Sequence, residues 1–359
     1  MKKLDFYIIK KFLGTFFFSI VLIISISIVF DFSENLDEFI EKEVPISDIV
    51  FDYYLNFVPY FANLFSPLFI FISVIFFTSK MASDTEIIAI LASGVSFKRL
   101  LVPYLISASI IAVLSIFLNS FIIPHSNAKR LEFTYKYIHT KNKNKNENVH
   151  LQLANNSYAY VGSYSIPNNI GIKFTLEQFS ESGELTYKLI ADFIRWDTTK
   201  NLWTIQNYYE RTIDGYHETI KKGISKDTTI NMHIEEFTRR DRDVEMLDYF
   251  QLEKQIEAEK FKGSKKVVLF EIEKYRRTAF PFASIVLTLI GAAIASRKVR
   301  GGIGMHLGFG LALSFGYILF MKVCQTFSTN GGLHPIIAMW IPNVIFGILA
   351  IYLLKKAPK

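Results

Sequence analysis

Ser83-Asp84-Thr85-Glu86 has the spacing of a helix-initiating S-x-x-E box. In this box the serine side chain accepts a hydrogen bond from the third amide, and the glutamate reaches back to the capping residue. Apolar residues follow at helical spacing, and a glycine suits the end of the helix. The pattern predicts a helix over about 83–93, which is too short to cross a membrane. Either Glu86 only caps this helix, or the helix couples the chain to a separate motor subunit through Asp84, Glu86, Ile87, Ile90, Leu91 and Gly94.

Four basic residues lie beside or within apolar stretches in the last third of the chain. Three of them, Lys274, Arg276 and Arg277, directly precede an apolar stretch, and Lys322 lies near the end of the next stretch. Long basic side chains can extend to a membrane interface and contact ordinary phospholipids. They can also bind the anionic headgroup of a lipid that enters between helices. Both readings remain open.

Small residues recur every four positions in the fifth apolar stretch, at Gly304, Gly308, Ala312 and Gly316. This spacing puts them on one helix face, and small residues allow helix backbones to approach closely in lipid. The face can pack within its own chain, or it can meet a second chain across a contact that opens and closes.

Motifs for enzymatic chemistry are absent from the sequence. It contains no G-x-x-x-x-G-K-[ST], no H-E-x-x-H and no G-x-S-x-G. The 7 histidines are scattered, and the single cysteine, Cys324, excludes an internal disulfide. We therefore expect no catalytic residue, no metal and no cofactor. The formal charge of +7 is spread along the chain, which argues against nucleic acid as a partner.

Six apolar stretches surround a polar block of about 150 residues in a 3 + 3 pattern. Each stretch has roughly 20 residues, the length of a helix that crosses the hydrocarbon core of a membrane. The predicted spans are 12–30, 57–79, 100–123, 279–296, 303–323 and 335–354. Few ionisable residues lie in them, whereas ion-coupled carriers place acids at mid-membrane. The energy source is therefore expected to lie outside this chain.

The basic residues of the short loops predict the orientation of the spans. Basic residues mark the cytoplasmic loops of membrane proteins. Lys2, Lys3, Lys10 and Lys11 put the N-terminus inside, and Arg297, Lys298 and Arg300 put the loop after the fourth span on the same side. The first loop, 31–52, has eight acids and only Lys42, so it is expected outside. Both termini are then cytoplasmic, and the polar block is extracytoplasmic.

The polar block has the alternation of β-strands from Val149 onward. Strand patterns occur at 149–153, 157–161, 170–174, 185–189 and 202–205, with turn signals between them. Short strands at this spacing suggest a sandwich or an open jelly roll. The low-complexity segment 141–148 predicts a loop, and 245–260 predicts a helix that leads back to the fourth span. An all-β domain of this kind can sense or adhere, or it can pass cargo to another β protein.

The whole layout resembles the lipopolysaccharide-export permease family, the LptF/LptG type of ABC transporter subunit. Three local matches support the resemblance: the segment 84–96, the E-x-x-R-R-x-A-x-P pattern over 273–281, and the last-span segment 331–343 with Trp340-Ile341-Pro342-Asn343. The fold class expected is a polytopic α-helical membrane protein with six transmembrane helices and an inserted all-β jellyroll domain. Its domains would be 1–124 with the coupling helix, 125–272, and 273–359.

The resemblance also implies a function and partners. Two such permeases form a dimer that takes lipopolysaccharide from the inner membrane, and a cytoplasmic ABC ATPase dimer drives the step. The jellyroll passes the lipid to a periplasmic bridge protein of like domains. On this reading Glu86 and Gly94 belong to the coupling helix, the Gly304 face and the first span line lateral gates, and Lys274, Arg276 and Arg277 meet sugar phosphates.

One feature departs from the family. Family members tend to carry basic residues near the outer end of the first span, where this chain has Asp31, Glu34, Asp37 and Glu38. Two other interpretations stay open: a permease for another lipid or lipoprotein, and a membrane protein with an adhesive β domain and no transport.

Overall fold

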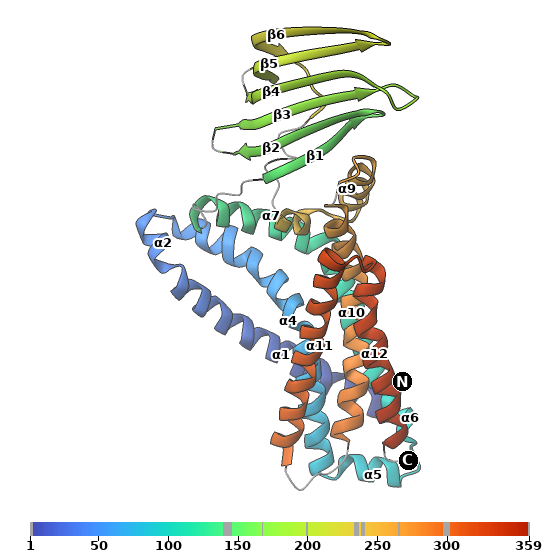
Figure 1. Ribbon diagram of the computed structural model, residues 1–359. Coiled ribbons are helices and arrows are strands. Elements are labelled where there is room, and N and C mark those ends of the chain that lie inside the picture. The colour runs from blue at the N-terminus through green and yellow to red at the C-terminus, as the bar shows by residue number, and fades with distance from the viewer. Residues whose placement is uncertain are drawn as a thin grey trace. The chain divides into compact units, whose positions relative to one another are not determined.

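The chain divides into two compact units, which are coloured by residue number in Figure 1. The membrane unit comprises Met1–Thr140, Glu245–Leu252 and Val268–Lys359, and the β domain comprises Lys141–Val244 and Glu253–Val267. The structure is a computed structural model that describes residues 3–138, 146–166, 168–198, 200–232, 237, 241–264, 266–296 and 302–357.

Six helical segments among the described residues are long and apolar enough to cross a membrane, which confirms the predicted number. They are Lys3–Glu34, Ile46–Ser83, Phe97–Ile138, Val267–Ala295, Gly304–Gly331 and Pro335–Lys356. Each overlaps a predicted span, and most extend beyond it because polar residues can continue a helix into the membrane interface. The third extends farthest. Residues 125–138, which we assigned to the second domain, are helical and belong to the membrane unit.

Shorter helices precede, follow or join these spans. In chain order the first half consists of α1 (Lys3–Glu34), α2 (Leu36–Glu41), α3 (Ile46–Asp48), the π-helical η1 (Ile49–Tyr54), α4 (Leu55–Ser83), α5 (Glu86–Ala92), α6 (Phe97–Phe117), the π-helical η2 (Leu118–Ile122), α7 (Ile123–Phe133) and the π-helical η3 (Thr134–Ile138). The second half consists of α10 (Val267–Ala295), α11 (Gly302–Gly331) and α12 (Pro335–Lys356). The acidic loop predicted at 31–52 is therefore largely helical.

α4 and α10 are the central helices of the membrane unit. Their most apolar windows are 61% and 67% buried, against 22% for α1 and 28% for α11. α1 packs on α4 and α6 through Ile8 and Phe12, and α11 packs on another face of α4 through Tyr317. Gly310 permits this approach, because a Cβ there would lie 2.4 Å from Cδ1 of Ile75. α1 and α11 are thus peripheral helices held by α4.

Asn343 of the Trp-Ile-Pro-Asn segment links the last three spans. Its Nδ2 donates to the carbonyl of Ala279 at 2.7 Å, and its Oδ1 accepts from Tyr317 Oη at 3.0 Å. A hydrogen bond between helices is favourable in lipid because no water competes for the polar groups. The last-span signature therefore has a packing role.

The β domain contains one antiparallel sheet in which the strands follow one another in chain order. The strands are β1 (Asn146–Ala154), β2 (Ser157–Ser165), β3 (Ile170–Phe179), β4 (Leu185–Asp197), β5 (Leu202–Asp214) and β6 (His217–Thr228). All five predicted strands are present and longer than predicted, and the inserted all-β domain is confirmed. The described strands form a single open sheet, so the two-sheet sandwich was wrong. Of the predicted low-complexity loop 141–148, residues 141–145 lie outside the described part, and residues 146–148 belong to β1 instead.

One face of this sheet forms the core of the β domain. Phe174, Ile194 and Trp203 are buried there, and Trp203 Nε1 donates to the carbonyl of Met232 at 2.9 Å. Two helical elements follow: η4 (Asp241–Met246) and α9 (Tyr249–Phe261), the latter at the predicted position.

Candidate functional site

α5 forms where a short helix was predicted, but its N-terminus differs from the prediction. Ser83 is the last residue of α4, and the residue that precedes α5 is Thr85, with φ of 60° and no side-chain cap. The S-x-x-E box was therefore wrong. It requires Ser83 outside the helices and Glu86 turned back on the chain, whereas the Glu86 side chain reaches α1. At the other end Gly94 has φ of +86° and donates to Leu91 O, as predicted for a helix end.

Glu86 is bound to the first helix. Its carboxylate oxygens accept from Tyr7 Oη at 2.9 and 3.1 Å, and Lys11 Nζ lies 3.3 Å from Oε1. Tyr7 and Lys11 are four residues apart and share one face of α1, and Lys11 Nζ lies 4.3 Å from the centre of the Tyr7 ring. This pairing could not be predicted from local spacing, because the partners lie more than 70 residues away in the chain.

A second ionic contact holds the same end of α1. Asp5 accepts two hydrogen bonds from the guanidinium of Arg99, both at 2.7 Å, and Asp5 is 3% exposed. Arg99 lies in the first turn of α6, which follows α5. The bidentate geometry is the strongest form of such a pair.

The apolar residues of α5 divide between two faces. Ile87 is buried in the same cluster as Ile8 and Phe12, and Ile90 and Leu91 pack against it. Ile88 is 55% exposed, and Asp84, Ala89 and Ala92 are exposed as well. The predicted contact residues Ile87, Ile90 and Leu91 thus face their own chain, and the sequence analysis missed Ile88.

A buried ion cluster lies where α10 begins. Arg276 Nε and Arg277 Nε donate to the two carboxylate oxygens of Glu273 at 2.8 and 2.9 Å. Arg277 is 4% exposed, so its guanidinium is inside the fold. Removing one partner of such a buried pair is strongly destabilising, because it leaves an uncompensated buried charge.

Glu245 joins this cluster from η4, outside the spans. Asn127 Nδ2 donates to its Oε2 at 3.5 Å. Burial raises the pKa of Glu245 above its usual range, against the opposing effect of Arg276. The two other predicted headgroup residues are more accessible: Lys274 is half-buried, and Lys322 is exposed and donates to Gln325 at 3.3 Å.

The small residues of α11 face away from their own chain. A Cβ added at Gly304, Gly308 or Gly316 would have no other atom within 4 Å. The packed face of α11 is formed instead by His306, Gly310 and Ser314, each two positions further on, and by Tyr317. Residues two positions apart in a helix are separated by about 200° around its axis. This face therefore does not pack against its own chain, which was one of the two interpretations left open.

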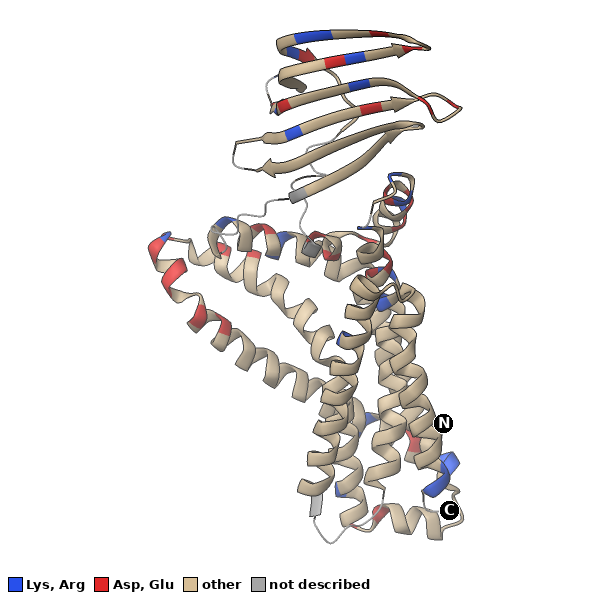
Figure 2. Ribbon diagram, viewed as in Figure 1, with Lys and Arg blue, Asp and Glu red and all other residues tan. Residues whose placement is uncertain are grey.

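The C-terminal end of α1 has an acidic surface. Figure 2 shows Asp and Glu positions, in red, along this end of α1 and on α2. Asp31 accepts from Tyr53 Oη at 3.2 Å and from Tyr54 Oη at 3.1 Å, whereas Glu34 and Asp37 are exposed. The acidic residues that depart from the family pattern thus lie at the end of α1 and on α2.

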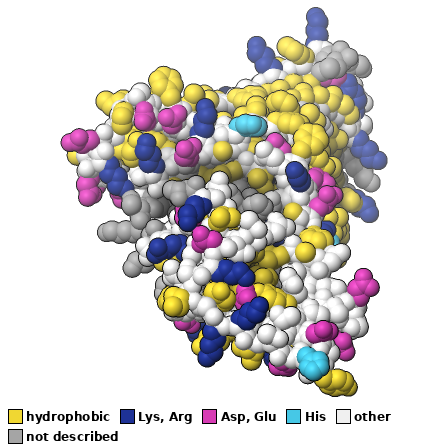
Figure 3. Space-filling model, turned by 90° about the horizontal axis from the view of Figure 1, so that it is seen from above, with side chains coloured by type: hydrophobic (Ala, Val, Ile, Leu, Met, Phe, Trp, Pro, Cys, Tyr) yellow, Lys and Arg dark blue, Asp and Glu magenta, His cyan; other side chains and the backbone are white. Residues whose placement is uncertain are grey.

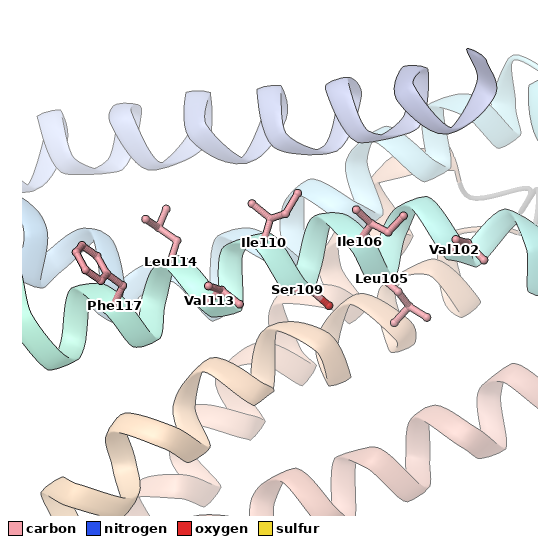
Figure 4. Close-up of a pocket in the computed structure, with 8 residues that line it drawn as sticks. All are labelled: Val102, Leu105, Ile106, Ser109, Ile110, Val113, Leu114 and Phe117. Carbon is pink, nitrogen blue, oxygen red and sulfur yellow. The ribbon is translucent and has the colours of Figure 1, made fainter. Parts of the chain in front are cut away.

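Many large apolar side chains of the spans are exposed, among them Phe18, Phe30 and Val113. Figure 3 shows patches of apolar side chains on one face of the molecule. A 790 Å³ groove on α6 is lined by eight residues of that helix between Val102 and Phe117, of which only Ser109 is polar (Figure 4). Surfaces of this composition suit lipid chains and are unsuited to water. They agree with a chain that lies in a membrane.

The β domain has a cavity of 370 Å³ on the core face of its sheet. Leu153, Leu176, Leu189 and Ile205 contribute apolar walls, and Tyr187 and Lys226 contribute polar ones. Tyr187 Oη donates to Glu210 at 3.2 Å, and burial together with the Glu210 charge raises the pKa of Tyr187 to about 12. The cavity can take an apolar chain with a polar group at its edge.

Metal-binding chemistry has no site among the described residues. Nowhere in that part of the chain do three His, Cys, Asp or Glu side chains gather as metal ligands would.

The chain was compared with known proteins. The model of one family, described as lipopolysaccharide export system permease LptF/LptG, matches residues 6–356. No curated protein matches the chain.

Proposed function

Because this chain belongs to the LptF/LptG family of lipopolysaccharide export permeases, we propose that it is the permease subunit of an ABC transporter that extracts lipopolysaccharide from the inner membrane and passes it to a periplasmic bridge. The observation that carries the proposal is a family match over nearly the whole chain, including all six spans and the β domain. The protein is accordingly a multi-pass inner membrane protein.

In this proposal a cytoplasmic ABC ATPase dimer supplies the energy and docks on α5. The exposed Ile88, with Ala89 and Ala92 beside it, supports this role, because an apolar side chain at a polar membrane surface favours a partner protein. Asp84 and Gly94 would border the contact. The apolar residues Ile87, Ile90 and Leu91 would transmit force to the spans that they touch.

A sister permease would meet the free face of α11. Gly304, Gly308, Ala312 and Gly316 form an unfilled small-residue face, and α1 is the least buried of the spans. A contact of small residues buries little side-chain volume, so it can separate and re-form at modest cost. Lipid would enter between α1 of one chain and α11 of the other.

The headgroup of the lipid would be met by accessible basic residues. Lys322 is exposed, and Lys274 is half-buried on the neighbouring helix. Arg276 and Arg277 are already paired with Glu273, so their contribution would be to hold α10 and to keep the local charge positive.

The β domain would receive the acyl chains. Moving an acyl chain into water costs about 0.8 kcal/mol per CH₂, so a closing membrane cavity can expel it only toward another apolar surface. The apolar walls of the 370 Å³ cavity suit this task. The proposal also requires a periplasmic β domain and cytoplasmic termini.

Photo-crosslinking in cells tests the proposal directly. A benzoyl-phenylalanine at Leu176, which lines the cavity, should crosslink lipopolysaccharide, and only when the ATPase is active. The matched control is Ile190, which pairs with Thr175 on the opposite face of the sheet and should not crosslink.

Other outcomes identify the rival functions. A crosslinked phospholipid or lipoprotein at Leu176 would replace lipopolysaccharide as the cargo. Equal labelling with and without ATP hydrolysis would show that the β domain binds without transport.

A further inference from the structure

The groove on α6 joins a long apolar surface to a basic end. We propose that it is a binding site for an anionic phospholipid, whose acyl chain lies along α6 and whose phosphate contacts Lys98. This lipid belongs to the surrounding membrane rather than to the cargo, so the inference goes beyond the proposed function. It requires only that the six spans lie in a membrane.

The groove is long enough for an acyl chain. It extends over residues 102–117 of α6, as Figure 4 shows, which is about 22 Å of helix at a rise of about 1.5 Å per residue. One leaflet contributes about half of the roughly 30 Å hydrocarbon core, or about 15 Å. The acyl chain of a lipid from one leaflet can therefore lie in the groove over its full length.

The side chains of the groove favour an acyl chain over a second helix. Ile110, Val113 and Phe117 are large and exposed, and Val113 is 66% exposed. None of the eight residues that the structure describes in this lining is glycine or alanine. Helices associate in lipid through small residues, which let their backbones approach closely. A flexible acyl chain needs no such approach and can follow an uneven surface.

Lys98 continues the groove toward the start of α6. It is exposed, and it lies four residues before Val102 and seven before Leu105, so the three share one face of the helix. Side chains of a helix tilt toward its N-terminus, and the aliphatic stem of a lysine can extend to the membrane interface. The ammonium group is therefore expected at the depth where the phosphate of a lipid in this groove lies.

The headgroup must supply the selectivity of this site. An apolar groove gains little by exchanging one acyl chain for another, because all lipids of the bilayer offer similar chains. The neighbouring Arg99 is already paired, since its guanidinium donates two hydrogen bonds of 2.7 Å to Asp5. The exposed charge of Lys98 attracts an anionic headgroup more strongly than a zwitterionic one.

The end of α12 brings two further basic residues to the same end of the groove. Ala357 is buried in the same cluster as Phe97 at the start of α6, and Leu354 packs against that cluster. Lys355 and Lys356 lie between these two contacts and are exposed. Lysines of two helices therefore gather where the headgroup is expected, as in basic sites that bind anionic lipids between helices.

The opposite end of the groove has no comparable charge. After Phe117 the sequence contains no ionisable side chain before His125. The lipid is therefore oriented, with its phosphate at the N-terminal end of α6 and its acyl chain directed toward Phe117.

Photo-crosslinking with defined lipids tests the site. The full chain is placed in nanodiscs of phosphatidylcholine with a trace of a lipid that carries a diazirine on its acyl chain. The headgroup of this probe is either phosphatidylglycerol or phosphatidylcholine, and mass spectrometry of peptides locates the label. The anionic probe should label residues 102–117 about fivefold more than the zwitterionic probe, the factor expected for one lysine at a lipid phosphate. High salt should reduce this difference by screening.

Three variants identify the residue that selects the headgroup. K98A should remove the preference for the anionic probe, whereas K98R should keep it because the charge remains. K80A is the matched control, since Lys80 is an exposed lysine at the end of another span, and it should label as the wild type does. All three should keep the wild-type melting temperature, because both lysines are exposed.

Four outcomes would overturn the site. They are equal labelling of the wild type by both probes, an unchanged preference in K98A, a crosslink of α6 to another protein chain in place of the lipid, and displacement of the anionic probe by added lipopolysaccharide. The last outcome would assign the groove to the cargo. Failure of lipopolysaccharide to crosslink at Leu176 would instead contradict the proposed transport and leave the preference at α6 unchanged.

Discussion

Glu273 is the centre of the ion cluster at the start of the fourth span. Its two oxygens hold two guanidiniums, and it is itself buried, so the three side chains form one unit. The pattern E-x-x-R-R places both arginines within one turn of the acid, at i+3 and i+4. The local spacing thus builds the cluster.

Replacing Glu273 with alanine should strongly destabilise the protein. The change leaves Arg277 buried without its carboxylate, and removal of one partner of a buried pair costs about 3–5 kcal/mol. The melting temperature of the purified chain should fall by several degrees. E181A is the control, because Glu181 is exposed in the turn between β3 and β4. Equal melting temperatures for E273A and E181A would show that the arginines find other partners.

Glu245 should make stability depend on pH. Burial raises its pKa in the folded protein above the usual 4.5, so the folded state keeps a proton that the unfolded state releases. Stability is then present below pH 4.5 and declines as the pH rises through the raised pKa. E245Q removes this titration, so its melting temperature relative to wild type should increase from pH 4 to pH 7. E181Q, an exposed acid, should follow the wild type, and parallel curves for E245Q and wild type would contradict the prediction.

Residue chemistry was predictable from the sequence only where the partners are near in the chain. The E-x-x-R-R pattern marked residues that do cluster, although the sequence could not tell that Arg277 is buried and paired. The partners of Glu86 could not be found at all. A capping box can be predicted from four consecutive residues, whereas the contact with Tyr7 depends on how α1 packs.

At the scale of elements, α11 has one packed face and one face that its own chain leaves open. Gly310 and Tyr317 lie on the face that packs against the chain's own helices, whereas Gly304 and Gly308 lie on the free face. Both faces contain glycine, so composition alone does not distinguish them. The four-residue repeat marked only the free face.

Of two glycine substitutions on α11, one should destabilise the single chain and the other should weaken its assembly with a partner permease. G310L would push into Ile75 and should destabilise the single chain by about 1–3 kcal/mol, because overpacking forces the core to shift. G308L meets no atom of its own chain, so the melting temperature of the single chain should hardly change. G308L should instead reduce the amount of partner permease that co-purifies. If G308L leaves that amount unchanged, this face is not the contact.

The elements themselves were largely predictable. Six apolar runs predicted six spans, and alternation predicted five strands, because burial in lipid and burial on one sheet face both leave periodic patterns. β6 was missed because this edge strand is exposed along most of its length and its charged residues hide the alternation. The helical extension over 125–138 was missed because packing, rather than apolar composition, continues the helix beyond the span.

At the scale of the whole molecule, the proposed transport depends on which side of the membrane each unit occupies. The α5 docking surface requires the cytoplasm, and the cavity of the β domain requires the periplasm. Charge alone supports this orientation, since basic residues precede the first span and end the last one.

Cysteine labelling should reveal opposite sides for the two units. In a C324A background, which removes the only native thiol, Y216C places a cysteine at the fully exposed hairpin between β5 and β6. A92C places one on the exposed face of α5. A membrane-impermeant maleimide added to cells with a permeable outer membrane should label Y216C and leave A92C unlabelled, and A92C should react only after the inner membrane is broken.

The buried position of Cys324 provides the control for this experiment. Wild-type protein should stay unlabelled in both conditions, because that thiol is 5% exposed on α11. Labelling of A92C in intact cells together with protection of Y216C would invert the topology. An inverted chain would place α5 away from the cytoplasmic ATPase and the β domain away from any periplasmic bridge, so the proposed transport mechanism would lose its physical basis.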